Sequence, residues 1–384
     1  MSLVEEAVAD PHTAYARLAR EGDVVHDEPS GSWFVLSAEL VRRLSRDPRL
    51  RARGVPAAVS EMSPGSPIIE VEHFLGRWLV FSDPPLQSRV RRALAPCLAR
   101  PAVAARLVGL ADVARTLATD LAAQGGDLVA DLAVPLSRRT TAAILEATPE
   151  EMSELEESSA ALIDYLSTPG FDEPAAARAV HAIARLRAVF EDGMVPRGGQ
   201  VARALSDAAA IEAGIGPEDA VAACAQLLTG AMEPLTTALV VASLLAQALP
   251  AAAADDPPTI RALVEEALST EPPFHFAPRV AAADFEVGGQ SVSAGDRVVL
   301  NLLAANADLR GRCPAGAVPD HLSFGSGTHF CLGAAATRLH LESVLPAVIG
   351  TGVARRIDLS EVGRRPAFGA TAFAHVPVRG GAAR

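Results

Sequence analysis

A glycine-rich stretch at 324–333, with the sequence FGSGTHFCLG, constrains the fold of this chain more than any other segment. It holds one thiol, Cys331, between aromatic side chains and glycines, and it leads directly into the apolar, helix-compatible run 334–349. Glycines let the backbone approach a large flat group, and N–H groups at a helix start favour negative charge and therefore a thiolate. We predict that Cys331 is the axial ligand of a soft metal ion. The alternative is a buried structural cysteine in a glycine turn.

This stretch resembles the haem-ligand loop of the cytochrome P-450 superfamily, Phe-x-x-Gly-x-His/Arg-x-Cys-x-Gly, and it matches that pattern at every fixed position. The resemblance implies haem b (iron protoporphyrin IX) as the cofactor, with Cys331 as the ligand of its iron. It also implies that Phe324 packs against the haem and that His329 reaches a haem propionate. Gly333 then lets the backbone come close to the macrocycle. The other cysteines lack such surroundings and are interpreted as structural: Cys97, Cys224 and Cys313.

Composition narrows the class of protein. No linker rich in Pro, Gly or Ser divides the 384 residues, so we expect a single domain over 1–384. The 34 basic residues are all arginine, which excludes a Schiff-base lysine and a phosphate-binding P-loop lysine. A net charge of −12 argues against general nucleic-acid binding. The cysteines show no paired spacing and the N-terminus shows no signal pattern, so a cytoplasmic location is predicted.

One apolar stretch, 220–254, is long enough to cross a bilayer, which takes about 20 residues. It carries a carboxylate near its centre, Glu233, and a charge at that depth in a membrane is costly. We therefore predict no membrane span. A long helix buried in a soluble domain, over about 215–249, explains the stretch better.

That predicted helix resembles the family helix that crosses the distal face of the haem, where Ala/Gly-Gly-x-Asp/Glu-Thr is usual. The corresponding stretch here is GAMEP, residues 230–234. Gly230 is small enough for close approach to a flat macrocycle, and Glu233 keeps the acid. Pro234 replaces the threonine that supports proton delivery in the family.

Proline has no hydroxyl, and inside a helix it leaves the carbonyl of Gly230 without its usual partner and produces a kink. Two interpretations of Pro234 remain open: a purely structural kink, or a changed route for protons. In the second, the proton donor is a water held at Gly230 or a nearby hydroxyl. The hydroxyls close to it in sequence are Thr229, Thr236 and Thr237.

The segment 83–92, DPPLQSRVRR, resembles the start of another family helix, on which a His and an Arg one turn apart reach a haem propionate. Asp83 is expected to cap this helix. Arg91 keeps the Arg position, whereas Gln87 stands in place of the His. A neutral amide still donates a hydrogen bond, so haem binding is expected to be weakened rather than lost. For Arg91 the alternative is a surface arginine.

Farther along, Arg279 resembles the strand arginine that binds a haem propionate in the family. Phe274, His275 and Phe276 precede it and, by the resemblance, point toward the distal pocket. His275 is a candidate contact for substrate or iron, with a satisfied structural histidine as the alternative. A β-hairpin is predicted around the Gly-Gly pair at 288–289.

Two family elements are altered. The helical segment 260–270 resembles the helix that carries Glu-x-x-Arg, but Ser269 replaces the Arg that would pair with Glu266. The segment that carries a second Arg, the family's meander, is missing from the short gap 309–320. Removing one partner of a buried charged network is costly, whereas removing both charges can be neutral, so Glu266 is expected to be exposed, protonated or paired elsewhere. Candidate partners are Arg310 and Arg312.

The resemblance implies a mainly α fold with small β-sheets, the triangular-prism helical domain of haem-thiolate proteins. Apolar spacing adds helices near 103–124, 138–145, 149–166 and 173–192. The implied partners are a small-molecule or carrier-protein-bound substrate and a ferredoxin-type electron donor.

The implied function is that of a haem-thiolate oxidoreductase. We expect it to tailor a specialised metabolite, by monooxygenation or by another haem-iron oxidation with atypical proton delivery. The alternative is a haem-binding scaffold without turnover that helps a partner enzyme.

Overall fold

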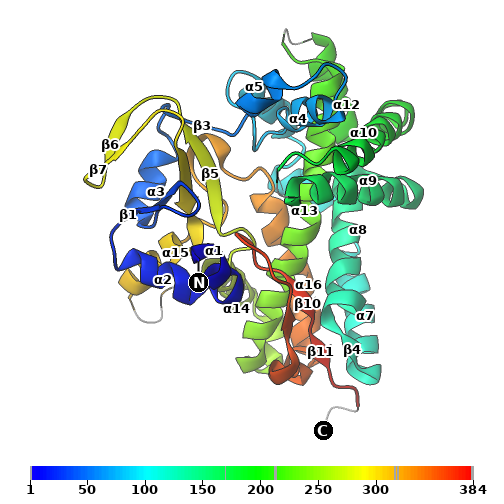
Figure 1. Ribbon diagram of the computed structural model, residues 1–384. Helices are drawn as coiled ribbons and strands as arrows, with labels where there is room; N and C mark the ends of the chain where they lie inside the picture. The colour runs from blue at the N-terminus through cyan, green and yellow to red at the C-terminus, as the bar shows by residue number, and fades with distance from the viewer. Residues whose placement is uncertain (1, 169, 212–213, 315–316, 318–319, 382–384) are drawn as a thin grey trace. The chain divides into compact units, whose positions relative to one another are not determined.

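The computed structural model describes residues 2–168, 170–211, 214–314, 317 and 320–381. The chain is mainly helical with small β-sheets, as predicted (Figure 1). The described residues divide into two compact units. Unit 1 comprises Met1–Arg51, Val108–Arg138 and Glu233–Arg384, and unit 2 comprises Ala52–Leu107 and Arg139–Met232. The expectation of one domain over the whole chain stays a prediction.

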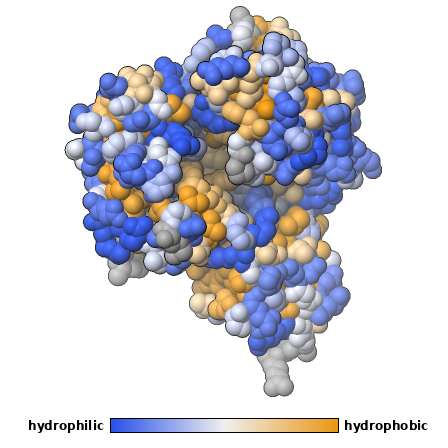
Figure 2. Space-filling view, in the orientation of Figure 1, coloured by the Kyte–Doolittle hydropathy of each residue, from blue (hydrophilic) through white to orange (hydrophobic). Residues whose placement is uncertain are grey.

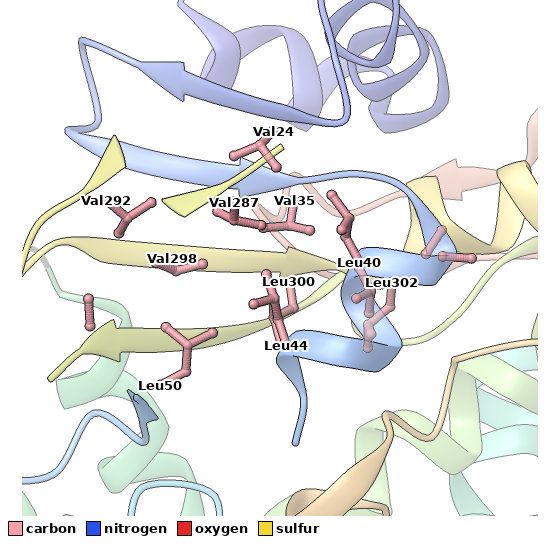
Figure 3. Packing of buried hydrophobic residues seen from close by; sticks show 14 of the residues in the cluster. Val24, Val35, Leu40, Leu44, Leu50, Val287, Val292, Val298, Leu300 and Leu302 are labelled. Carbon is pink, nitrogen blue, oxygen red and sulfur yellow. The ribbon is translucent and has the colours of Figure 1, made fainter. Parts of the chain in front are cut away.

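Unit 1 is built around a five-stranded sheet of order β1-β2-β8-β5-β3, in which β2 and β8 are parallel and the other neighbours antiparallel. The strands are β1 (Val24–Asp27), β2 (Ser32–Val35), β3 (Leu50–Arg51), β5 (Phe276–Ala281) and β8 (Arg297–Asn301). Apolar side chains of this sheet and of α3 (Ala38–Leu44) form one core cluster (Figure 3). The sheet is therefore anchored on its α3 face.

Shorter strands complete unit 1. The predicted hairpin is β6 (Phe285–Val287) and β7 (Gln290–Val292), joined by Gly288 and Gly289 at φ values of 58° and 76°. Two further pairs are β9 (Gly363–Arg364) with β10 (Phe373–His375), and β4 (Gly126–Asp127) with β11 (Pro377–Val378). The helices that lie wholly in unit 1 are α1 (Leu3–Ala9), α2 (Pro11–Ala19), α3, α7 (Leu110–Gln124), α14 (Pro257–Thr270), α15 (Leu302–Arg312) and α16 (Ala334–Gly350).

Unit 2 is helical. Its helices are α4 (Pro67–Leu75), α5 (Leu86–Leu94), α6 (Arg100–Arg106), α9 (Pro149–Ser167), α10 (Glu173–Ala188), α11 (Val195–Arg197) and α12 (Gln200–Ile211). Inside it, the buried carboxylate of Glu72 binds Arg53 at 2.8 Å and the hydroxyl of Tyr165 at 2.9 Å. The side that carries α9 and α10 is mainly hydrophilic (Figure 2) and holds ion pairs such as Arg178–Asp164 at 2.6 Å.

The single helix predicted over 103–124 is wrong. Two helices, α6 and α7, cover this stretch, and Gly109 separates them at a φ of 82°, a left-handed conformation that ends one helix before the next begins. The other three predicted helices are present as α8 (Val134–Leu145), α9 and α10.

The predicted long helix is α13 (Pro217–Leu245), followed by a 3-10 turn at Ala246–Ala248. Pro234 lies inside it. Among the described residues, one helical stretch, Pro217–Ala248, is long and apolar enough to span a membrane, but 56% of its apolar window is buried. The core helix of a soluble protein has the same property, so this stretch is weak evidence for a membrane span.

Candidate functional site

Cys331 lies in unit 1, between the 3-10 turn Gly327–His329 and α16. Its backbone N–H donates to the carbonyl of Phe324 at 2.8 Å, which closes the loop. Gly325 and Gly327 have φ values of 69° and 67°, and a Cβ on Gly327 would lie 2.4 Å from the carbonyl oxygen of Ser45. These two glycines are therefore required by the turn that presents Cys331.

The four cysteines differ in exposure. Cys331 is exposed, Cys313 is partly exposed, and Cys97 and Cys224 are buried. Burial raises the pKa of the Cys224 thiol to about 12, so this thiol stays protonated and inert. Cys331 is thus the one exposed residue among the four cysteines, and an iron ligand must be accessible to the cofactor. The alternative of a buried structural cysteine at 331 is wrong.

Side chains around the loop fit a flat aromatic ligand. Phe330, next to Cys331, is 45% exposed, whereas Phe324 is buried behind the loop and 6.3 Å from Phe330 between ring centroids. A Cβ on Gly333 would contact the Cys331 sulfur at 3.7 Å, an ordinary distance. The protein's own packing therefore allows a larger residue at position 333, and the small residue leaves space beside the sulfur.

Glu266 is exposed on α14, which is one of the outcomes expected for it, and the neighbouring acid Glu265 is the one that contacts Arg338 and His321. Glu265, one residue earlier, accepts hydrogen bonds from Arg338 on α16 at 2.5 and 2.8 Å and lies 3.0 Å from Nε2 of His321. Sequence reasoning missed both Glu265 and Arg338. A usable signal is that Arg338 lies near the start of α16, the helix that directly follows the Cys331 loop.

Ser269 stands where an arginine is expected, and an arginine of α15 contacts it. Arg310 donates to the backbone carbonyl of Ser269, which is fully buried. Burial lowers the pKa of Arg310, and the charge of Glu271 opposes this effect. Arg312, the other candidate, instead pairs with Asp308 at 2.7 Å, one turn earlier on α15. Arg310 therefore fills the place of the missing side chain without binding Glu266.

Arg279 is on β5, paired in register with Val298 of β8. Its side chain is 6% exposed, and its guanidinium donates to the carbonyl of Pro278 at 2.7 Å. A buried arginine is costly unless it meets acceptors. Its position on the strand agrees with the propionate role that the sequence predicts, and that role stays a prediction.

On α13, the predicted proton-delivery residues differ in their surroundings. Glu233 is exposed and forms an ion pair with Arg365. Thr237 is buried and its hydroxyl donates to the carbonyl of Thr371 at 3.1 Å. Thr236 is also buried, at 8% exposure. Pro234 is half-buried, one residue after the acid.

The residues of α13 on the unit 2 side complete this description. Thr229 donates its hydroxyl proton to the carbonyls of Ala225 and Gln226, both at 3.2 Å. Gly230 is exposed, and an added Cβ there would meet no described atom within 4 Å. The protein's own described atoms therefore do not require glycine at position 230.

His275 is a structural residue. It is fully buried, and its Nε2 lies 2.9 Å from the hydroxyl of Thr371, which in turn donates to Glu271 at 2.8 Å. Its neighbour Phe274 is 49% exposed. Of the two interpretations of His275 left open by the sequence, the contacts support the structural one.

Unit 2 holds Gln87 and Arg91 on α5. Gln87 is fully buried, and its side-chain carbonyl accepts from the Ser88 hydroxyl at 3.3 Å. Arg91 lies one turn later, in the last turn of the helix. Asp83 is predicted to cap α5, but the N-cap position is Pro85; the Asp83 carboxylate accepts from the backbone N–H of Ala52 at 3.1 Å.

Comparison with known proteins supports the family. No family model matches the chain. The chain is 27% identical over 372 residues to 20-oxo-5-O-mycaminosyltylactone 23-monooxygenase of Streptomyces fradiae, covering 88% of this chain and 82% of the relative. It is 28% identical over 350 residues to erythromycin C-12 hydroxylase of Saccharopolyspora erythraea, covering 86% and 84%.

Solved structures share the fold. P450BioI, solved in complex with a hexadec-9Z-enoic acid ligated acyl carrier protein, has a TM-score of 0.83 at 21% identity, covering 98% of this chain and 100% of that one. CalO2 has a TM-score of 0.84 at 22% identity, covering 98% and 97%. Fold, loop and relatives together define a haem-thiolate protein. These findings support a member of the bacterial cytochrome P-450 superfamily, and the relatives imply haem b as the cofactor.

Proposed function

We propose that this protein is a cytoplasmic haem-thiolate monooxygenase that tailors a specialised metabolite. The observation that carries the proposal is the exposed thiol of Cys331, presented by a glycine turn in front of α16. Support for the activity comes from relatives that are named as 20-oxo-5-O-mycaminosyltylactone 23-monooxygenase and as erythromycin C-12 hydroxylase. The iron ligand in this proposal is Cys331.

The bound haem supplies the iron that activates dioxygen, and electron donation from the thiolate favours cleavage of the O–O bond. The protein supplies the iron ligand, the side chains that bind the cofactor and the route by which protons are delivered. In unit 1, Arg279 and His329 are proposed to hold haem propionates, with Phe324 and Gly333 at the ligand loop. In unit 2, Gln87 and Arg91 are proposed for the same task, and Gly230 for close approach to the macrocycle.

Proton delivery is proposed to start at Glu233 and to pass through water. The hydroxyl proton of Thr237 is engaged with the carbonyl of Thr371, so this residue is poorly placed to pass a proton on. Pro234 leaves the carbonyl of Gly230 without a helical N–H donor, and such an acceptor can hold a water molecule. Water at Gly230 therefore replaces the missing threonine hydroxyl better than Thr237 does.

The proposed partners are a ferredoxin-type electron donor and a small-molecule or carrier-protein-bound substrate. The acyl carrier protein in the complex of P450BioI supports the carrier-bound form as one of the two. The scaffold without turnover is not favoured, because the relatives are named as enzymes and because charged residues make contacts close to the place of the missing network. Arg310 binds at Ser269, and Glu265 pairs with Arg338.

The test is spectroscopic and then catalytic. Reduced, haem-loaded protein treated with carbon monoxide should give the red-shifted Soret band from which the family takes its name, and a Cys331→Ala variant should lack it. Substrate-dependent consumption of electrons, with oxygenated product, would separate a monooxygenase from a scaffold. A protein that stays colourless after haem supplementation would refute the assignment.

A further inference from the structure

Four side chains form a cluster behind the Cys331 loop, all within unit 1. Glu265 is at the centre, bound by Arg338 and His321. The guanidinium carbon of Arg338 lies 4.7 Å above the ring centroid of Phe324, and the His321 ring is 5.7 Å from the same ring. We call these residues, Glu265, Arg338, His321 and Phe324, the Arg338 clamp.

The clamp is held by charges in a partly buried place. The side chains of Arg338 and Glu265 are 29% and 28% exposed. Burial would raise the pKa of Glu265, but hydrogen bonds from Arg338 and His321 outweigh it and lower this pKa to about 2, so the carboxylate is ionised at neutral pH. The planar guanidinium suits both contacts of Arg338, since it binds a carboxylate in two places and stacks on an aromatic face.

The clamp is connected to the sulfur by the backbone and by charge. The carbonyl of Phe324, whose ring the clamp fixes, accepts the N–H of Cys331 at 2.8 Å. Cys331 also contributes to the electrostatic environment of Arg338. A charge that interacts with a metal ligand changes the electron density that the ligand donates, and the groups around a ligand tune a metal site in this way.

We propose that Arg338 is a positioning residue of the haem-thiolate site: with Glu265 and His321 it fixes Phe324 behind the ligand loop, and the net charge of the clamp sets the reduction potential of the haem. This inference rests on the proposed role of Cys331 as the iron ligand. It gives Arg338 and Glu265 roles opposite in sign, because one carries a positive and the other a negative charge.

The test is a charge cycle measured by redox titration of the haem-loaded protein. Arg338→Gln leaves the cluster more negative, so the potential should fall. Glu265→Gln leaves it more positive, so the potential should rise. The double variant restores the net charge and should return close to the wild-type value. A purely structural clamp would instead shift both single variants in the same direction, and that result would overturn the proposal.

Two further variants make the test decisive. Arg115→Gln on α7 removes the same charge from an exposed pair with Asp112, 67% and 77% exposed, and should leave the potential unchanged. Arg338→Lys keeps the charge but loses the two-point contact. Its potential should stay near the wild-type value, whereas the thiolate Soret band should be lost at lower urea concentration.

If Arg338→Gln fails to fold, the reduction potentials of Glu265→Gln and Arg338→Lys can still be compared. The proposal requires the potential of Glu265→Gln to be the higher of the two. Equal shifts of the reduction potential in Arg115→Gln and Glu265→Gln would refute the role of the Arg338 clamp in setting that potential. Failure of the wild-type protein to give the thiolate band would instead refute the proposed function, so the two failures are distinguishable.

Discussion

At the scale of single residues, the buried ring of His275 shows how its neighbours fix a protonation state. The Thr371 hydroxyl has one proton, and it goes to the carboxylate of Glu271, which can only accept. Nε2 of His275 must therefore donate to that hydroxyl. Burial lowers the pKa of His275 to about 4, against the opposing charge of Glu271, so the ring is neutral with its proton on Nε2.

A pH dependence of stability follows from this neutral ring. Burial also lowers the pKa of His340 to about 4, from 6.5. Since the unfolded chain takes up protons below pH 6.5 and these two rings do not, stability should be full above that pH and should fall toward pH 4, by roughly 3 kcal/mol per ring. The free energy of unfolding, measured with urea at intervals from pH 7 to pH 5, checks this prediction. Glu271 remains ionised in the folded protein over this range, because its pKa is lowered.

His275→Gln removes one of the two titrating rings. Its unfolding free energy should therefore depend less steeply on pH over that range than that of the wild-type protein. An unchanged slope would contradict the assignment of a neutral buried ring at position 275.

Residue-scale inference from sequence was limited by rotation about the helix axis. The pattern places an acid on α14 but cannot choose between two adjacent glutamates, which differ by about 100° around a helix. The neighbours of α14 decide this, and they select Glu265. The ligand loop was easier to predict from the sequence, because its glycines are required by a local turn geometry that any matching fold must reproduce.

At the scale of elements, α13 combines a long apolar core helix with one internal proline. Pro234 removes one helical hydrogen bond, and the protein keeps this defect next to an exposed acid, Glu233. The existence and position of the helix could be predicted from its apolar length. The engagement of Thr237 could not, because its partner Thr371 is far away in sequence.

Pro234→Ala should separate the structural from the functional meaning of the proline. Restoring an N–H at position 234 gives the carbonyl of Gly230 its helical partner again, so the free energy of unfolding should rise by about 1–3 kcal/mol. The same bond removes the acceptor for the proposed water. A larger share of the electrons should then end in hydrogen peroxide rather than in product.

The matched control is Pro346→Ala, which removes the proline inside α16. It should also stabilise the protein, but the peroxide yield should not change. Equal peroxide yields in the two variants would contradict a role of Pro234 in proton delivery.

At the scale of the whole molecule, the two compact units raise the question of cooperativity. The chain has no linker in its sequence, which predicts one domain, and α13 continues from one unit into the other. A long helix shared by two units is expected to couple their unfolding. Sequence composition alone could not reveal the units, because each of them is assembled from segments far apart in the chain.

Glu72→Gln tests this coupling. Glu72 is 2% exposed and neutralises Arg53 inside unit 2, so its loss should cost about 3 kcal/mol. Hydrogen exchange followed by mass spectrometry should show reduced protection in the cores of both units. Reduced protection in unit 2 alone would contradict a single cooperative domain. The control is Glu154→Gln, which removes an exposed ion pair with Arg185 and should leave the protection of both units unchanged.

The unequal exposure of the thiols has a practical consequence for handling this enzyme. An alkylating reagent should react quickly with Cys331 and Cys313 in cofactor-depleted protein, while Cys97 and Cys224 are shielded. Loading with haem should protect Cys331 alone, so peptide mass mapping gives occupancy at the sulfur without a spectrum. Because the chain has no lysine, amine-directed labels leave every side chain untouched and are compatible with the same sample.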